Sequence, residues 1–73
     1  MSPNMVEVFK TNVQRRRQAK MLLDVLSRKF PSFRINFDLE DCDRILRIEG
    51  ENICHEKVAE LLSENGYQCE VLE

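Results

Sequence analysis

The chain has little of what most enzyme active sites are built from. Its 73 residues include one histidine, no tryptophan and two glycines. Because His55 is the single histidine, no His-based acid–base pair and no Ser-His-Asp triad can form without it. Two isolated glycines do not make a glycine-rich phosphate loop. We therefore expect no enzymatic activity and no cofactor.

Long apolar runs are also missing from the sequence. No segment approaches the roughly 18 consecutive apolar residues that a membrane-spanning helix needs. Residues 1–13 lack the apolar segment of a secretory signal. Two glycines and two prolines are too few for a linker-like or low-complexity chain. We expect one folded domain over residues 1–73, located in the cytoplasm and without a membrane partner.

The three cysteines lie too far apart to form a Cys-x-x-Cys pair or a known zinc pattern. Their odd number leaves at least one thiol without a partner in the chain. Cys54 and His55 are adjacent at the start of a predicted helix, but no third metal ligand is evident beside them. The sequence thus predicts reduced thiols, and it leaves open whether Cys42, Cys54 or Cys69 binds a metal or is redox-active.

The net charge of −2 hides an asymmetry between the two halves of the chain. Residues 1–34 carry eight basic and two acidic side chains, whereas residues 35–73 carry three basic and eleven acidic ones. The basic half includes Arg15, Arg16 and Arg17 in succession. Such a separation either marks a basic binding face or draws the two halves together in the fold.

The first predicted element is a strand over residues 5–10. Val6 and Val8 alternate there with Glu7 and Phe9, as in a strand that has one covered face. We expect the two valines to face the core and Phe9 to lie on the open side of a sheet.

Two helices are predicted from apolar residues that recur at helical spacing. The first covers residues 15–30 and ends at Pro31, since the residue before a proline avoids the α region. The second covers residues 53–65 and is followed by Gly66, a residue typical of helix ends. The apolar stripes are Ala19, Leu22, Leu23, Leu26 and Phe30 in the first helix, and Val58, Leu61 and Leu62 in the second.

Three further strands complete the pattern. Residues 33–39 and 44–49 alternate on either side of a polar turn at residues 40–43, which predicts an antiparallel hairpin. Residues 67–72 alternate again. This order is that of the ferredoxin-like α+β fold, a βαββαβ two-layer sandwich in which two helices cover one face of a four-stranded antiparallel sheet.

Chain direction in this topology places three loops at one end of the domain, namely residues 11–16, 40–43 and 65–67. The three arginines and the acidic turn should therefore be neighbours. Asp41 and Asp43 would then offset the unfavourable position of arginines at a helix N-terminus. Each exposed ion pair of this kind contributes only about 0–1 kcal/mol.

Four segments carry a resemblance to a known family. They are residues 8–13 (VFKTNV), 35–40 (INFDLE), 46–50 (LRIEG) and 64–67 (ENGY). Together they resemble heavy-metal-associated domains, the modules of copper chaperones and metal-transporting ATPases. The resemblance covers most of the chain and implies the ferredoxin-like fold. In that family, two cysteines of a Cys-x-x-Cys motif hold a soft metal in the loop after the first strand.

The chain departs from this family at the metal ligands themselves. The degenerate loop consists of Asn12, Val13, Arg15 and Arg16, and the two ligand positions fall at about Val13 and Arg16. Thiolate ligands select Cu(I), whereas a valine cannot coordinate and an arginine brings positive charge. We expect no metal to bind in this loop.

A nucleic-acid-binding module is one alternative with the same topology. The first strand faintly resembles that of RNA-recognition modules, which also stack bases on aromatic side chains of the third strand. Residues 44–49 contain no aromatic residue. Phe9, Arg34 and Arg47 would offer only a poor stacking surface, so nucleic-acid binding is disfavoured.

The uncovered face of the predicted sheet is the candidate interface. Phe9, Ile45 and Leu72 should lie close together there, with Arg34 and Arg47 beside them. An apolar centre with a charged rim is the composition of a protein interface. We expect a non-enzymatic binding module that forms a homodimer or binds another protein through this face. The alternatives are an atypical metal-binding or transport protein and, less favoured, a single-stranded nucleic-acid binder.

Overall fold

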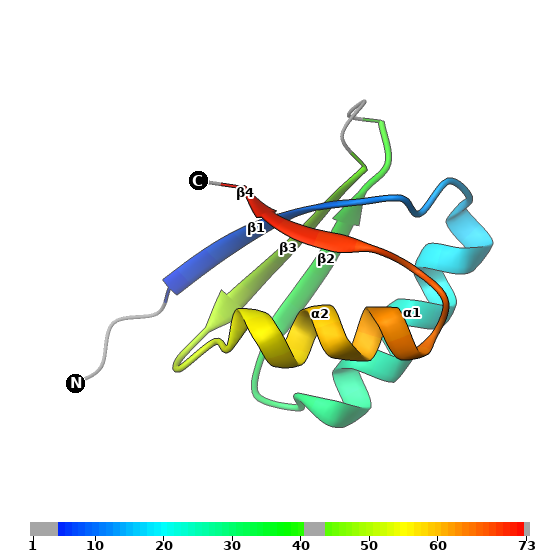
Figure 1. The fold of residues 1–73 in the computed structure, drawn as a ribbon. Helices are drawn as coiled ribbons and strands as arrows, with labels where there is room; N and C mark the ends of the chain where they lie inside the picture. Colours follow the sequence, from blue (N-terminus) through cyan, green and yellow to red (C-terminus); the bar gives the residue numbers. More distant parts are fainter. Residues whose placement is uncertain (1–4, 41–43, 73) are drawn as a thin grey trace.

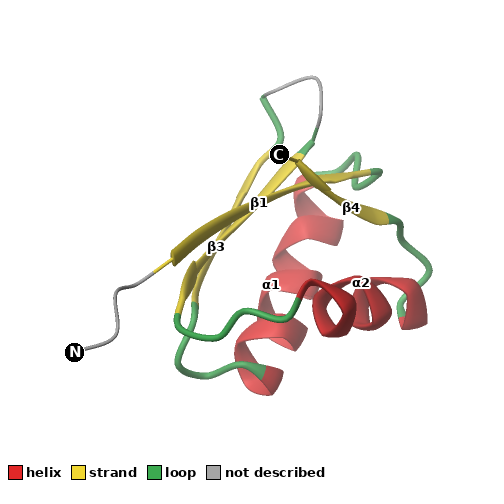
Figure 2. Ribbon diagram, turned by 60° about the vertical axis from the view of Figure 1, so that its left-hand side comes forward, coloured by secondary structure: helices red, strands yellow, loops and turns green. Residues whose placement is uncertain are grey.

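The computed structural model describes residues 5–40 and 44–72, which form four strands and two helices in the predicted order (Figure 1). The strands make one antiparallel sheet in the order β2-β3-β1-β4. Both helices lie on one face of the sheet and leave the other face open (Figure 2). The predicted ferredoxin-like α+β fold is confirmed. The elements are β1 (Met5–Thr11), α1 (Arg16–Lys29), β2 (Arg34–Asp38), β3 (Ile45–Gly50), α2 (His55–Glu64) and β4 (Cys69–Leu72).

The helix ends follow the signals in the sequence to within two residues. The backbone N–H of Phe30 donates to the carbonyl of Leu26 at 2.8 Å, after which Pro31 prevents further helix. Helix α2 closes through the side-chain amide of Asn65, which donates to the carbonyl of Leu61 at 2.8 Å. Gly66 follows with φ +88°, a left-handed conformation that a glycine adopts without a steric cost.

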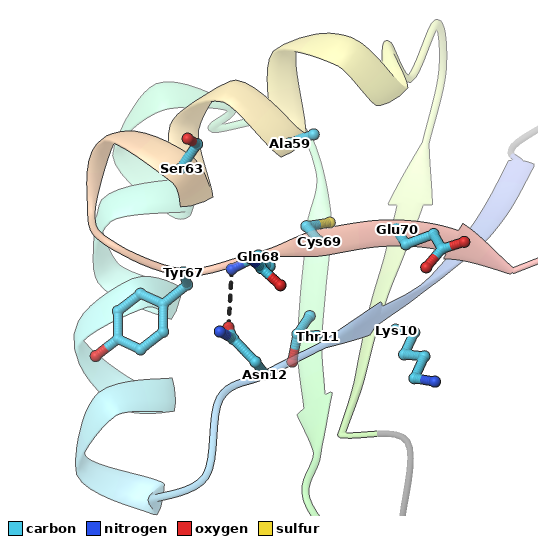
Figure 3. A pocket seen from close by; sticks show the side chains of 9 residues that line it. All are labelled: Lys10, Thr11, Asn12, Ala59, Ser63, Tyr67, Gln68, Cys69 and Glu70. Atoms are coloured by element: carbon cyan, nitrogen blue, oxygen red, sulfur yellow. Dashed lines mark hydrogen bonds between the residues drawn. The ribbon is translucent and has the colours of Figure 1, made fainter.

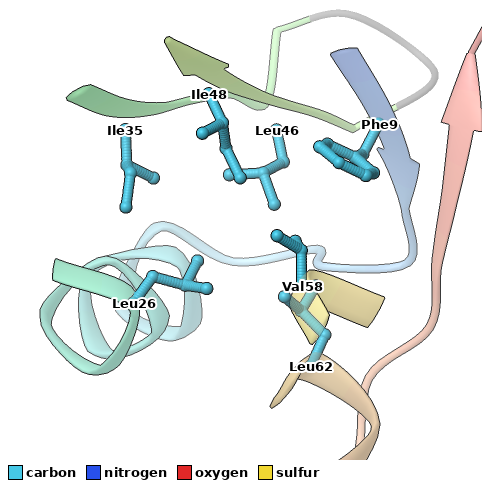
Figure 4. Packing of buried hydrophobic residues seen from close by; sticks show 7 residues of the cluster. All are labelled: Phe9, Leu26, Ile35, Leu46, Ile48, Val58 and Leu62. Atoms are coloured by element: carbon cyan, nitrogen blue, oxygen red, sulfur yellow. The ribbon is translucent and has the colours of Figure 1, made fainter. Parts of the chain in front are cut away.

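The main core lies between the helices and the covered face of the sheet (Figure 4). A smaller cluster of Val13, Ala19 and Leu22 lies beside it, under the β1–α1 loop. Complete burial of one such aliphatic or aromatic side chain contributes about 1.5–3 kcal/mol. The buried residues of the main core are Phe9, Leu26, Ile35, Leu46, Ile48, Val58 and Leu62.

The predicted orientation of the first strand was wrong. Phe9 lies opposite Leu46 in the β1–β3 pairing, and directly paired residues share a face of the sheet. Phe9 is therefore on the covered face, where 1% of its surface is exposed, whereas Val6 is 55% exposed on the open face. Both sides of β1 carry apolar residues, and burying the larger phenylalanine removes more apolar surface from water than burying a valine.

The helices of the described chain are not membrane spans. None of them has the length and apolar composition that crossing a bilayer requires.

Candidate binding surfaces

The β1–α1 loop is closed by its own side chains. The hydroxyl of Thr11 donates to the carbonyl of Arg44 at 2.6 Å and accepts from the backbone N–H of Val13 at 3.3 Å. The side-chain oxygen of Asn12 accepts from the backbone N–H of Gln68 at 2.8 Å. Val13 is fully buried, so its side chain serves the core rather than the surface. A loop that resembles a metal-binding loop is here a packing element.

Arg15 and Arg16 of this loop are exposed, as is the adjacent Arg17. The side-chain oxygen of Gln18 accepts from the backbone N–H groups of Gln14 and Arg15, at 3.3 and 3.2 Å. Helix α1 has no acidic residue in its first turn, so the positive N-terminal end of its macrodipole is not offset from within that turn. The prediction that Asp41 and Asp43 offset these arginines lies outside the described residues, as does Cys42.

Arg44 is a residue of this end that the sequence analysis missed. Its backbone has φ +52°, which is uncommon for a residue with a side chain. Its guanidinium donates to the carbonyl of Leu39 at 3.1 Å and to that of Gln14 at 3.4 Å. These bonds join the β2–β3 connection to the β1–α1 loop and confirm that the two lie at one end. A hollow of about 460 Å³ opens beside them, lined partly by Arg16, Asp38 and Glu40.

The open face of the sheet is arranged in rows by the strand register. Arg47 lies between Asn36 and Val8, and Leu72 follows on the far side of Val8. The same pairings place Ile45 in the next row on one side of Arg47 and Glu49 in the next row on its other side. The open face consists of Val6, Val8, Lys10, Arg34, Asn36, Asp38, Ile45, Arg47, Glu49, Glu70 and Leu72.

The predicted interface keeps four of its five residues on the open face, namely Arg34, Ile45, Arg47 and Leu72, and loses Phe9. Ile45 is only 6% exposed, whereas Leu72 is 38% exposed. Accessible apolar area on this face therefore comes from the apolar strip, which we define as Val6, Val8 and Leu72. The burial of Phe9 also removes the only aromatic side chain of the poor stacking surface considered for nucleic-acid binding.

A second contact that the sequence analysis missed joins β1 to α2. The His55 Nε2 atom lies 3.0 Å from a carboxylate oxygen of Glu7, and the ring of Phe9 meets the imidazole edge-on at 5.7 Å. The Glu7 side chain is 19% exposed and that of His55 is 46% exposed. Among the described residues, no group of three or more His, Cys, Asp or Glu side chains is placed to hold a metal ion.

The two described cysteines differ in environment. Cys54 is exposed at the residue before α2, whereas Cys69 is the first residue of β4 and is partly buried. Burial raises the pKa of the Cys69 thiol to about 12, because the thiolate loses hydration. Cys69 is therefore a neutral thiol near pH 7 and a poor nucleophile or metal ligand.

Comparison of the chain with protein-family models, with curated proteins and with solved structures found no match. The ferredoxin-like fold is consistent with a heavy-metal-associated domain, but the topology alone fixes no activity.

Proposed function

We propose that the chain is a non-enzymatic interaction module of the cytoplasm, similar to heavy-metal-associated domains, that acts through protein contacts made by its open sheet face. The observation that carries this proposal is the apolar strip of Val6, Val8 and Leu72. These side chains lie on the one large surface of the sheet that the helices leave uncovered. Covering them with a partner removes apolar area from water, which is the main driving force of association.

The charges around the strip favour a protein over a polyanion. Three basic and three acidic side chains share the open face, so its formal charge is balanced. Nucleic-acid binding relies instead on an excess of basic side chains. A balanced face also complements a second copy of itself, and we therefore take the homodimer as the first partner to test. The charged residues are Lys10, Arg34, Arg47, Asp38, Glu49 and Glu70.

Analytical ultracentrifugation across a concentration series tests this function. The native chain should associate at tens of micromolar, and the double variant Val6→Thr, Val8→Thr should stay monomeric. Threonine keeps the β-branched shape that suits a strand. Met21→Thr is the matched control, because Met21 is 48% exposed on α1 and away from the sheet face. A native chain that stays monomeric contradicts the homodimer, and a double variant that dimerises equally well contradicts the assignment of the contact to the apolar strip.

A further inference from the structure

Strand β4 is one edge of the sheet, and its backbone groups point alternately toward β1 and away from it. The C=O of Gln68 accepts from the N–H of Asn12 at 3.4 Å, and the N–H of Gln68 points to the same side. The alternation therefore directs the N–H and C=O groups of Cys69 and Val71 away from β1. No strand of the described chain lies beyond them. These four groups are placed to pair with an additional strand.

A hollow of about 580 Å³ adjoins the first part of β4 (Figure 3). Ala59 and Ser63 of α2 line it, and their small side chains one turn apart leave space beside the strand. Figure 3 shows the Cys69 sulfur on the side of β4 that faces Ala59. The strand itself contains no proline and no lysine, the residues that commonly protect an edge from pairing.

We propose that the β4 edge binds an extended segment of another protein as a fifth strand, with an apolar side chain of that segment in the hollow. Backbone pairing supplies affinity in this mode, and a pocket for alternate side chains supplies specificity. The site uses the outward backbone groups of β4 rather than the side chains of the apolar strip, of which only Leu72 belongs to β4, and it does not depend on the function proposed for the strip.

The occupant differs from a second copy of β4. The helix-facing side chains of β4 are Cys69 and Val71, which already pack against the core of their own chain and so are not free to enter the hollow of a partner. Antiparallel self-pairing centred on Glu70 would also set two carboxylates opposite each other, which is unfavourable. Charge also favours a basic segment. Lys10 and Glu70 both line the hollow, and Glu56 adds a second exposed carboxylate three residues before Ala59 on the same side of α2.

A synthetic peptide of alternating character, Lys-Val-Lys-Leu-Lys-Val-Lys with a fluorescein label, tests the edge directly by fluorescence anisotropy. In an added strand its Val and Leu side chains face the hollow, and the N–H groups of those same residues face β4. N-methylation of the Val and Leu amides should weaken binding at least about tenfold, because it removes those donors. N-methylation of the Lys amides, which point to solvent, is the matched control and should leave binding unchanged.

Three protein variants locate the site. Val71→Pro removes an outward N–H, a change that an edge strand tolerates, and Ala59→Phe fills the hollow without changing a residue of the strand. Both variants should bind the peptide at least about tenfold more weakly than the native chain does. The open-face variant Val6→Thr, Val8→Thr should bind the peptide as tightly as the native chain, which separates this site from the apolar strip. Hydrogen exchange should show the Cys69 and Val71 amides becoming protected when the peptide is added.

Several results would overturn the inference. Equal binding of the two N-methylated peptides would mean that charge alone holds them on the protein. A Kd weaker than about 1 mM for the unmethylated peptide on the native chain would mean that the edge is not a binding site. Protection of the Cys69 and Val71 amides that grows with protein concentration in the absence of peptide would assign the edge to a second copy instead.

Discussion

The two faces of the sheet are built from the same alternating strands but differ in what their side chains do. On the covered face, Phe9, Leu46 and Ile48 are almost completely buried against the helices. On the open face, Val6 and Leu72 keep much of their surface in water. Strand β1 is apolar on both faces, so the polarity pattern alone did not determine its orientation. In β1 the helices cover the face that carries Phe9, and the smaller valines lie on the open face.

Neighbouring residues of one strand can test this difference, since each covered residue has an open-face neighbour. The largest effect is expected at Phe9. Phe9→Ala should lower the free energy of unfolding by about 3–5 kcal/mol, because it leaves a cavity in the main core. Val8→Ala, one residue away on the open face, should cost less than about 1 kcal/mol. Urea unfolding followed by circular dichroism measures both.

A chain of this length has limited stability, and Phe9→Ala could unfold it completely. Phe9→Leu is then the measurable substitute, with a smaller loss in the same direction. A larger loss at Val8 than at Phe9 would contradict the assignment of the two faces.

A smaller effect is expected at Gly50, which lies opposite Met5 at the end of the covered face. A Cβ atom at this position would overlap the ring of Phe33. That ring also stacks on Phe30 at 5.2 Å, so it has little room to move away. Gly50→Ala should therefore cost about 1–3 kcal/mol, as overpacking does.

Glu49→Ala is the matched control for this substitution, since Glu49 precedes Gly50 and lies on the open face. It should change the unfolding free energy by less than about 0.5 kcal/mol. A stabilised Gly50→Ala chain would show that the Phe33 ring can be displaced at no cost.

The sequence was sufficient for the topology because its strongest signals are local. Helical spacing with Pro31 and Gly66 defines both helices, and Ile35 alternates unambiguously with charged or polar neighbours in β2. The orientation of β1 was not predictable from its own residues, since both faces are apolar. The pairing of Phe9 with Leu46 decides it, and that pairing joins distant parts of the chain.

The same reason explains the contacts that sequence analysis missed. The Thr11 hydroxyl donates a hydrogen bond to the Arg44 carbonyl, and the Glu7 carboxylate contacts His55 Nε2. Both contacts join residues that are far apart in the sequence. No local periodicity marks such pairs. The sequence analysis placed a degenerate metal loop at Val13 from a resemblance alone. Its burial in the smaller cluster depends on α1 packing, which the motif does not encode.

The smallest effect is expected at Glu7, the charged residue of the covered face. Glu7→Gln keeps the side-chain shape and removes the negative charge that faces His55 Nε2. Because the His55 side chain is half exposed, water screens this contact, and the loss should be at most about 1 kcal/mol. The loss should shrink further in high salt. Glu70→Gln, on the open face, is the control and should leave the unfolding free energy unchanged.

A loss above about 3 kcal/mol for Glu7→Gln would instead mean that Glu7 behaves as a buried ion that depends on its partner, as expected when one member of a buried pair is removed. The covered face would then be held together by a charge pair as well as by apolar packing, and the contrast between the two faces would be one of polarity as well as of side-chain size.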